Sequence, residues 1–166
     1  IKFNDKSFEE IVRKKLGKNI GNITETDLSK VNFLVIGDEV EDLEGIQYFH
    51  NLMFLRIEKD MVISLKNIEL IEKLDKLTSL KIEGRTSQDD VNIDFVKDLK
   101  NLRYLTIECI GIKDISAVGN LKKLNYLNMN SNNIFDLSCL QNLSSLKHID
   151  LEDDRVPHIM HMILRV

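Results

Sequence analysis

The sequence predicts an α/β solenoid, a right-handed coil of short repeats in which each turn adds one strand to a parallel sheet. Two observations predict it. The stretch 120–151 repeats itself after 22 residues (143 − 121), and the apolar spacing LxxLxxLxL occurs six times along the chain. The residues that recur in that stretch are Leu121 with Leu143, Leu124 with Leu146, and Leu127 with Ile149. This period and spacing are those of a leucine-rich repeat.

Each LxL predicts one short strand, because alternation sends its two apolar residues into the core and the residues beside them outward. A single turn of the coil cannot bury its leucines alone, whereas stacked turns bury them against one another. The strands that we expect are 33–37, 54–58, 79–83, 104–108, 126–130 and 148–152.

The segments between the strands predict turns on the convex side. Aspartates recur there, at Asp42, Asp114 and Asp136. A carboxylate after a turn accepts hydrogen bonds from free backbone N–H groups, so we expect these residues to cap short helical turns. Two intervals of 25 residues contain about three extra residues each and predict rim loops near 59–65 and 84–91. Only Asn132 supplies the internal Asn or Cys of the repeat family, which predicts a less regular solenoid.

Residues 1–30 predict a helical cap over the first apolar edge of the stack. Ser7 and Glu10 have the spacing of a capping box, with Ser7 as the expected N-cap, and Gly17 suits the helix exit. The apolar face of this helix consists of Phe8, Ile11, Val12 and Leu16. A second short helix is expected to begin at Thr24, with Asp27 three residues later.

We therefore expect one domain with three parts, in which the cap (1–30) is followed by the repeats (31–152) and an end segment (153–166). The end segment contains the single proline, Pro157, and then an apolar stretch that is expected to shield the last turn of the coil. Its apolar residues are Ile159, Met160, Ile163 and Leu164.

The composition excludes several classes of function. A net charge of −4, with Lys and Arg scattered among Asp and Glu, argues against nucleic acid, and no apolar run approaches the ~20 residues that cross a bilayer. Cys109 and Cys139 lie in no zinc motif and are expected to be free thiols. His158 and His161 have helical spacing but no third ligand. We expect no metal, no cofactor and no enzymatic activity.

The stretch "FNDKSFEEIVRKKLGKNIGNITETDLSKVNFLVI", followed by "VEDLEGIQYFHNLMFLRIE", resembles the cap and first repeat of internalins, leucine-rich repeat proteins of Gram-positive bacteria that are mostly secreted or wall-attached. The resemblance covers Phe3 to about Leu151. It implies a capped, curved solenoid whose concave face binds another molecule, often a protein, at the cell surface or outside the cell; a cytoplasmic location stays open. It does not carry over a partner.

The outward residues of the expected strands fall into three columns on the concave face. These are Phe33, Phe54, Ser79, Tyr104, Tyr126 and His148; Val35, Arg56, Lys81, Thr106, Asn128 and Asp150; and Gly37, Glu58, Glu83, Glu108, Asn130 and Glu152. Exposed rings rimmed by charge are typical of interface hot spots, and the glutamates favour a basic partner. The expected binding residues are Phe33, Phe54, Arg56, Glu58, Lys81, Glu83, Tyr104, Glu108, Tyr126, Asn128, His148 and Asp150.

Recognition of a protein is the function that we expect, but two others fit the same surface. A carbohydrate-binding module would stack sugar rings on the aromatic column, and an intracellular regulatory scaffold would use the same repeat. A purely structural explanation is also open, because like side chains stack on parallel strands ~4.8 Å apart. In that case Arg56 and Lys81 neutralise Glu58 and Glu83.

Overall fold

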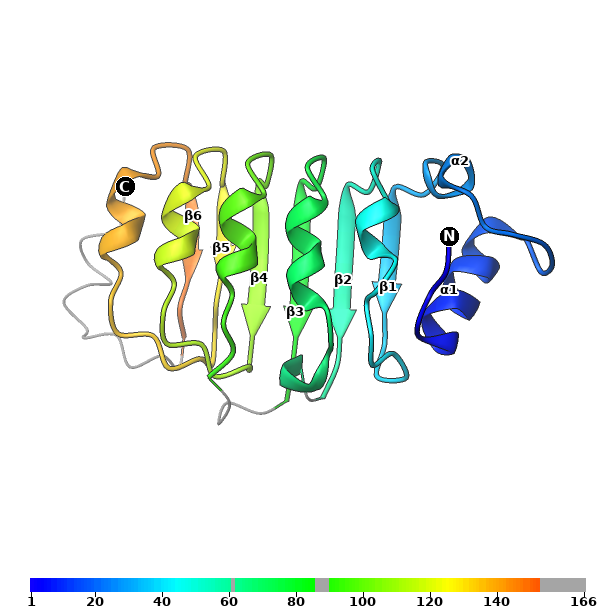
Figure 1. The fold of residues 1–166 in the computed structure, drawn as a ribbon. Coiled ribbons are helices and arrows are strands. Elements are labelled where there is room, and N and C mark those ends of the chain that lie inside the picture. The colour runs from blue at the N-terminus through cyan, green and yellow to red at the C-terminus, as the bar shows by residue number, and fades with distance from the viewer. Residues whose placement is uncertain (61, 86–89, 153–166) are drawn as a thin grey trace.

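The computed structural model describes residues 1–60, 62–85 and 90–152. Within these ranges the chain forms stacked turns, with a parallel sheet on one side and short 3₁₀ helices on the other (Figure 1). The strands are β1 (Phe33–Ile36), β2 (Phe54–Glu58), β3 (Ser79–Glu83), β4 (Tyr104–Glu108), β5 (Tyr126–Asn128) and β6 (His148–Asp150). Their order in the sheet is their order in the chain, which confirms the predicted solenoid.

The register of the sheet aligns the repeats at equal heights. Phe33 lies opposite Phe54, and the same row continues through Ser79 to Tyr104 and onward to β6. The row beside it contains the interior leucines, such as Leu80 opposite Leu105. Residues of one predicted column therefore lie next to each other across the sheet, wherever the strands are paired. This confirms the predicted columns within the strands.

Three strands end earlier than predicted, so that Gly37, Asn130 and Glu152 lie beyond the strand ends. After β1 the chain turns at once, because the N–H of Val40 donates to the carbonyl of Gly37 (3.2 Å). After β5 the side-chain oxygen of Asn128 accepts from the N–H of Asn130 (3.0 Å). Such local bonds draw the backbone out of the sheet.

The return segments contain short 3₁₀ helices, as the aspartates predict. These helices are η1 (Ile46–Tyr48), η2 (Val62–Ser64), η3 (Ile68–Lys73), η4 (Asp94–Asp98), η5 (Ser116–Asn120) and η6 (Ser138–Asn142). Asp42, Asp114 and Asp136 each accept a hydrogen bond of 2.8 Å from the N–H two residues later. The predicted hydrogen bonds to the turns are confirmed, although the residue directly before each of η1, η5 and η6 is Gly45, Ile115 or Leu137 and not the aspartate.

The expectation of a plain rim loop at 59–65 is wrong. That segment contains η2, and both Val62 and Leu65 are buried. Apolar side chains gain about 2 kcal/mol each by leaving water, so the insertion folds back onto the core. Of the second insertion, residues 86–89 lie outside the described residues, as does the expected shield at 153–166 with His158 and His161.

The cap consists of α1 (Lys6–Leu16) and α2 (Glu25–Leu28). The prediction of Ser7 as N-cap, with Glu10 reaching back, is wrong, because Asp5 is the N-cap and accepts from the N–H of Phe8 (3.0 Å). Its second oxygen accepts from the N–H of Glu41 (2.8 Å). One carboxylate therefore both starts the helix and ties it to the loop after β1.

The other features of the cap are as predicted. Gly17 ends α1 in the left-handed conformation (φ 62°), and Thr24 forms a capping box with Asp27. The apolar face of α1 meets the first turns of the coil through rings, since Phe8 lies edge-on to Phe3 (5.1 Å) and stacks on Phe49 (6.2 Å). These rings seal the first apolar edge of the stack.

Asn132 is a buried polar residue that links the turn of the coil containing β4 to the turn containing β5. Its side-chain oxygen accepts from the N–H groups of Ile110 (3.3 Å) and Ile112 (3.2 Å). Its amide donates to the carbonyls of Ile107 (2.8 Å), Met129 (2.8 Å) and Asn130 (3.2 Å). The side chain is only 3% exposed, so water cannot replace these bonds.

Replacement of Asn132 by leucine tests this network. The variant Asn132→Leu has a similar branched shape but leaves two N–H groups without an acceptor, so we expect the free energy of unfolding to fall by about 3 kcal/mol. Urea denaturation followed by circular dichroism measures it. The exposed Gln141→Ala is the control and should change the free energy by less than about 0.5 kcal/mol. Equal stability of wild type and Asn132→Leu would contradict the role given to Asn132.

The Asp27 carboxylate predicts a pH dependence of the cap. Its hydrogen bond from Lys18 Nζ (2.7 Å), and then that from the N–H of Thr24 (3.0 Å), hold the pKa of Asp27 well below its usual range. A lowered pKa stabilises the folded state above the unfolded value of about 3.9, and this contribution is lost as the pH falls further.

We therefore expect wild type to melt at a higher temperature than Asp27→Asn at pH 6, and the gap to narrow as the pH falls from 4 to 2. Thermal melts of both proteins at each pH measure the gap. The exposed Asp75→Asn serves as control for the general effect of removing one negative charge. A gap between wild type and Asp27→Asn that stays constant between pH 6 and pH 2 would exclude the carboxylate as its source.

Candidate functional site

The open face of the sheet, which we define as the outward side chains of β1 to β6, carries the predicted binding residues. It lies opposite the layer of 3₁₀ helices (Figure 1). Phe33, Phe54 and Tyr104 show 41%, 43% and 50% of their surface to solvent, while the leucines beside them in each strand are buried. The alternation of inward and outward side chains that the sequence predicts is thus confirmed, because the rings point away from the core.

Contacts within the sheet account for the positions of only some of the rings in the first column. Tyr126 and His148 stack with parallel rings 4.7 Å apart, and Phe33 lies under the Lys15 ammonium, 4.9 Å from Nζ to the ring centre. Phe54 and Tyr104 are separated by Ser79, and neither contacts another ring within the described part of the chain. Their exposure is not explained by the stability of the sheet.

The charged residues of the open face form ion pairs on β2 and β3, whereas the carboxylates on β4 and β6 are unpaired among the described residues. Arg56 forms ion pairs with Glu58 and with Glu83 (3.2 Å), and Lys81 pairs with Glu83 (2.9 Å). These pairs confirm that the two cations neutralise the nearby glutamates. Exposed pairs of this kind add little to stability, but they remove free charge from the middle of the face.

The carboxylates farther along the sheet are different. Glu108 on β4 and Asp150 on β6 form no ion pair with any described residue. Asn128, which lies between them in the sheet, directs its oxygen to the N–H of Asn130 (3.0 Å), so its main contact is structural. The β4–β6 half of the open face is therefore acidic and carries the Tyr104 and Tyr126 rings.

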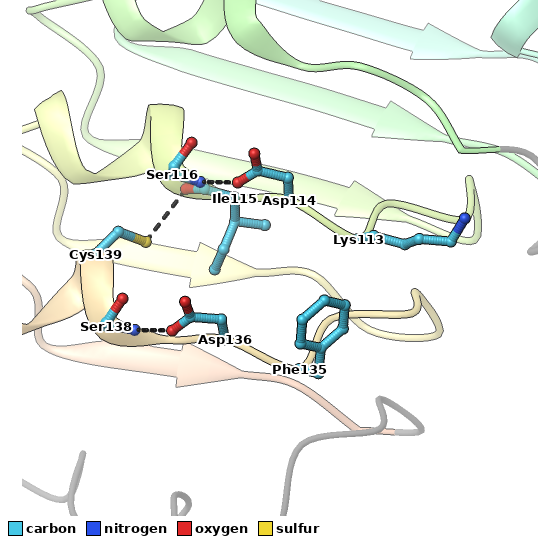
Figure 2. Close-up of a pocket in the computed structure, with 8 residues that line it drawn as sticks. All are labelled: Lys113, Asp114, Ile115, Ser116, Phe135, Asp136, Ser138 and Cys139. Atoms are coloured by element: carbon cyan, nitrogen blue, oxygen red, sulfur yellow. Dashed lines mark hydrogen bonds between the residues drawn. The ribbon is translucent and has the colours of Figure 1, made fainter.

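The sequence did not reveal a hollow of about 420 Å³ between the last turns of the coil (Figure 2). Its lining residues are Lys113, Asp114, Ile115, Ser116, Phe135, Asp136, Ser138 and Cys139. Phe135 is 62% exposed, and its only sequence signal is an aromatic residue where the preceding turn has Lys113. The hollow forms between two turns, so no single segment encodes it.

The polar groups of this hollow are engaged in the fold. The carboxylates of Asp114 and Asp136 cap their turns, and the Cys139 thiol donates to the carbonyl of Ile115 (3.2 Å). Burial, and then the negative charge of Asp136, raise the pKa of the Cys139 thiol to about 11. A thiol that stays protonated is a poor nucleophile, and this arrangement does not activate it.

A second groove, of about 440 Å³, lies between α1 and β1. It was also missed, because its two walls are about twenty residues apart in the chain. Its lining residues are Ile11, Lys14, Lys15, Phe33, Leu34 and Val35. The lysines lie in the last turn of α1 and make no ion pair with a described residue.

None of the helices in the described part of the chain has the length and apolar character needed to span a membrane. In the same part of the chain, no three His, Cys, Asp or Glu side chains are grouped so as to hold a metal ion.

The raised pKa of Cys139 predicts slow alkylation. In the variant Cys109→Ser, which leaves one thiol, we expect little reaction with iodoacetamide at pH 8 and a rate that rises with a midpoint near the pKa of about 11. Mass spectrometry at a series of pH values measures the rate. The unfolded chain in urea is the control and should react with a midpoint near 8.5. The same midpoint for folded and unfolded protein would show that burial does not protect the thiol.

Comparison with known proteins adds the family context. No family model and no curated protein matches the chain. A solved internalin of Listeria monocytogenes (inlF) is 28% identical, with a TM-score of 0.80 over 96% of this chain. The chain spans 46% of that internalin, or about half its length. Internalin C2 of the same species is 25% identical over 95% of this chain and 88% of its own, with a TM-score of 0.49. The six-stranded parallel sheet, the helical cap and the similarity to the inlF structure together show that the chain is an internalin-like leucine-rich repeat protein.

Proposed function

We propose that the chain is a non-enzymatic binding domain whose open face recognises another protein at the bacterial surface or outside the cell. The observation that carries this proposal is the pair of exposed rings, Phe54 and Tyr104, which lack a ring partner in the described structure and belong to a face that also carries the unpaired carboxylate of Glu108. The core does not need these side chains in this position.

The rings supply the apolar part of such an interface. Phe54 and Tyr104 are about half exposed, so a partner that covers them recovers about 1 kcal/mol of burial free energy for each ring. Ser79 lies between the two rings in the sheet register. Two strand spacings separate the rings, about 9.6 Å, which leaves room for one inserted side chain.

The charges indicate the character of the partner at this half of the face. Because Arg56 and Lys81 are already paired, the free charge comes from Glu108 and Asp150. A lysine or arginine of the partner would meet one of these carboxylates, and a second cation could lie over the Tyr104 ring. A basic, partly apolar surface fits this half best.

The proposed location rests on the likeness to internalins, which the cap sequence and the Listeria structure support together. Because the chain spans about half of that internalin, the location and partner of the whole protein are part of the proposal. Carbohydrate is the second candidate, since the half-exposed ring of Tyr104 offers a flat apolar surface of the kind on which sugars stack.

Photo-crosslinking at position 104 tests the proposal. With benzoylphenylalanine in place of Tyr104, we expect one dominant protein adduct in extracts and culture medium of the source organism. The same probe at Gln141, on the opposite layer of the fold, is the control and should give none. A binding signal on a glycan array that is lost with Tyr104→Ala and Tyr126→Ala, without a protein adduct, would favour carbohydrate instead.

With the captured partner purified, calorimetry of single variants measures the contributions. We expect Tyr104→Ala to weaken binding by about thirtyfold, as at an interface hot spot. Glu108→Lys should weaken it most at low salt, because the charge attraction is screened by ions. Glu69→Lys on η3 makes the same charge change away from the open face and should leave the affinity unchanged. Normal binding by both open-face variants would refute the proposal.

A further inference from the structure

The groove between α1 and β1 has features that the aromatic column does not explain. Ile11 of α1 and Val35 of β1 give it apolar walls, and its volume of about 440 Å³ is within the range of pockets that bind small ligands or a few residues of peptide. The elements that line it, α1 and β1, lie at the opposite end of the sheet from β4 to β6 (Figure 1).

The charge of this groove is opposite to that of the far end of the sheet. Lys14 and Lys15 are exposed, and no described carboxylate pairs with them, whereas Arg13 pairs with Glu9 and Lys18 with Asp27. Lys15 Nζ is held over the Phe33 ring at 4.9 Å, which places a cation directly above an apolar wall. An occupant with carboxylates beside apolar side chains would satisfy both features.

The backbone of β1 forms part of the wall. β1 is the first strand of the sheet, and its outer edge has no strand partner among the described residues. The carbonyl of Asn32 accepts from the N–H groups of Met53 (2.9 Å) and Phe54 (3.0 Å) and so faces β2. By alternation, the N–H and C=O groups of Phe33 and Val35 face the groove, where an extended chain could pair with them.

We propose that this groove binds a short, extended, acidic segment of a protein, which adds to the edge of β1 while its carboxylates meet Lys14 and Lys15. This inference rests on the proposed function only in taking the occupant to be a protein segment. A second copy of this chain fits less well through the same groove, because two facing copies would bring four lysines together.

The test uses peptides as probes and nuclear magnetic resonance on the ¹⁵N-labelled chain. The acidic pentapeptide Ac-EVEIE-NH₂ should shift the amide signals of α1 and β1, chiefly those of Lys14, Phe33 and Val35. Its basic counterpart Ac-KVKIK-NH₂ should leave them unmoved. Equal binding of both peptides, shifts centred on Tyr104 and Glu108, or no shifts at millimolar acidic peptide would each overturn the proposal.

Variants separate the contributions of charge and backbone. The double variant Lys14→Glu/Lys15→Glu should weaken binding of the acidic pentapeptide about tenfold or more. The matched pair Lys122→Glu/Lys123→Glu, also exposed, should leave binding unchanged. A pentapeptide methylated at the nitrogens that would face β1 should lose most of its affinity. If charge reversal or methylation has no effect, the mode of binding is refuted.

One further variant keeps the two proposals apart. Tyr104→Ala should leave binding of the acidic pentapeptide intact, because the ring lies three strands from the groove. Failure of the peptide experiments with a normal photo-crosslink at position 104 would refute the groove alone. Light scattering with and without the peptide reports on self-association, and a concentration-dependent dimer abolished by Lys14→Glu/Lys15→Glu would assign the groove to a second copy and overturn the proposal.

Discussion

Burial of the strand leucines between neighbouring turns is the constraint on which the rest of the structure depends. Leu80 and Leu105 are at most 1% exposed, and each reaches that state only because the next turn covers it. No turn has a core of its own, so the stability of the coil is a sum over interfaces between neighbours. The same packing fixes the register of the sheet, since a slip by one residue would expose every leucine.

A fixed register leaves the outward residues free to differ. Phe54, Ser79 and Tyr104 occupy one row although they share no chemistry, because their neighbours Leu55, Leu80 and Leu105 hold them there. The ends of the stack lack this mutual cover. At the N-terminal end the cap supplies it, with Phe8 between Phe3 and Phe49 and with Asp5 bound to both the helix and the following loop.

Features that follow from one repeat could be predicted from the sequence. Strand positions and the outward columns needed only the alternation of apolar residues, and Asp114 and Asp136 needed only local turn chemistry. The N-cap was missed because both Ser7 and Asp5 suit that position, and the contact that favours Asp5 comes from Glu41, far along the chain.

Features that join separate segments escaped prediction for the same reason. The folded insertion with Val62, the hollow beside Phe135 and the groove beside Lys15 each need two segments placed together in space. Of the candidate site, the sequence predicted which side chains face outward. It also offered neutralisation of Glu58 and Glu83 by Arg56 and Lys81 as an open alternative, but it did not predict that Arg56 pairs with both glutamates or that Glu108 and Asp150 stay unpaired among the described residues.

Because the strands follow one another in chain order, the number of repeats sets the distance between the two ends of the open face. One more 22-residue turn, inserted in the middle, would move the cationic groove and the acidic β4–β6 half of the open face apart by about 4.8 Å without altering either one. Related proteins with a different number of turns could therefore bind ligands of different length. They would keep the groove beside β1 and the acidic half of the open face, and only the distance between the two would change, in steps of one strand spacing.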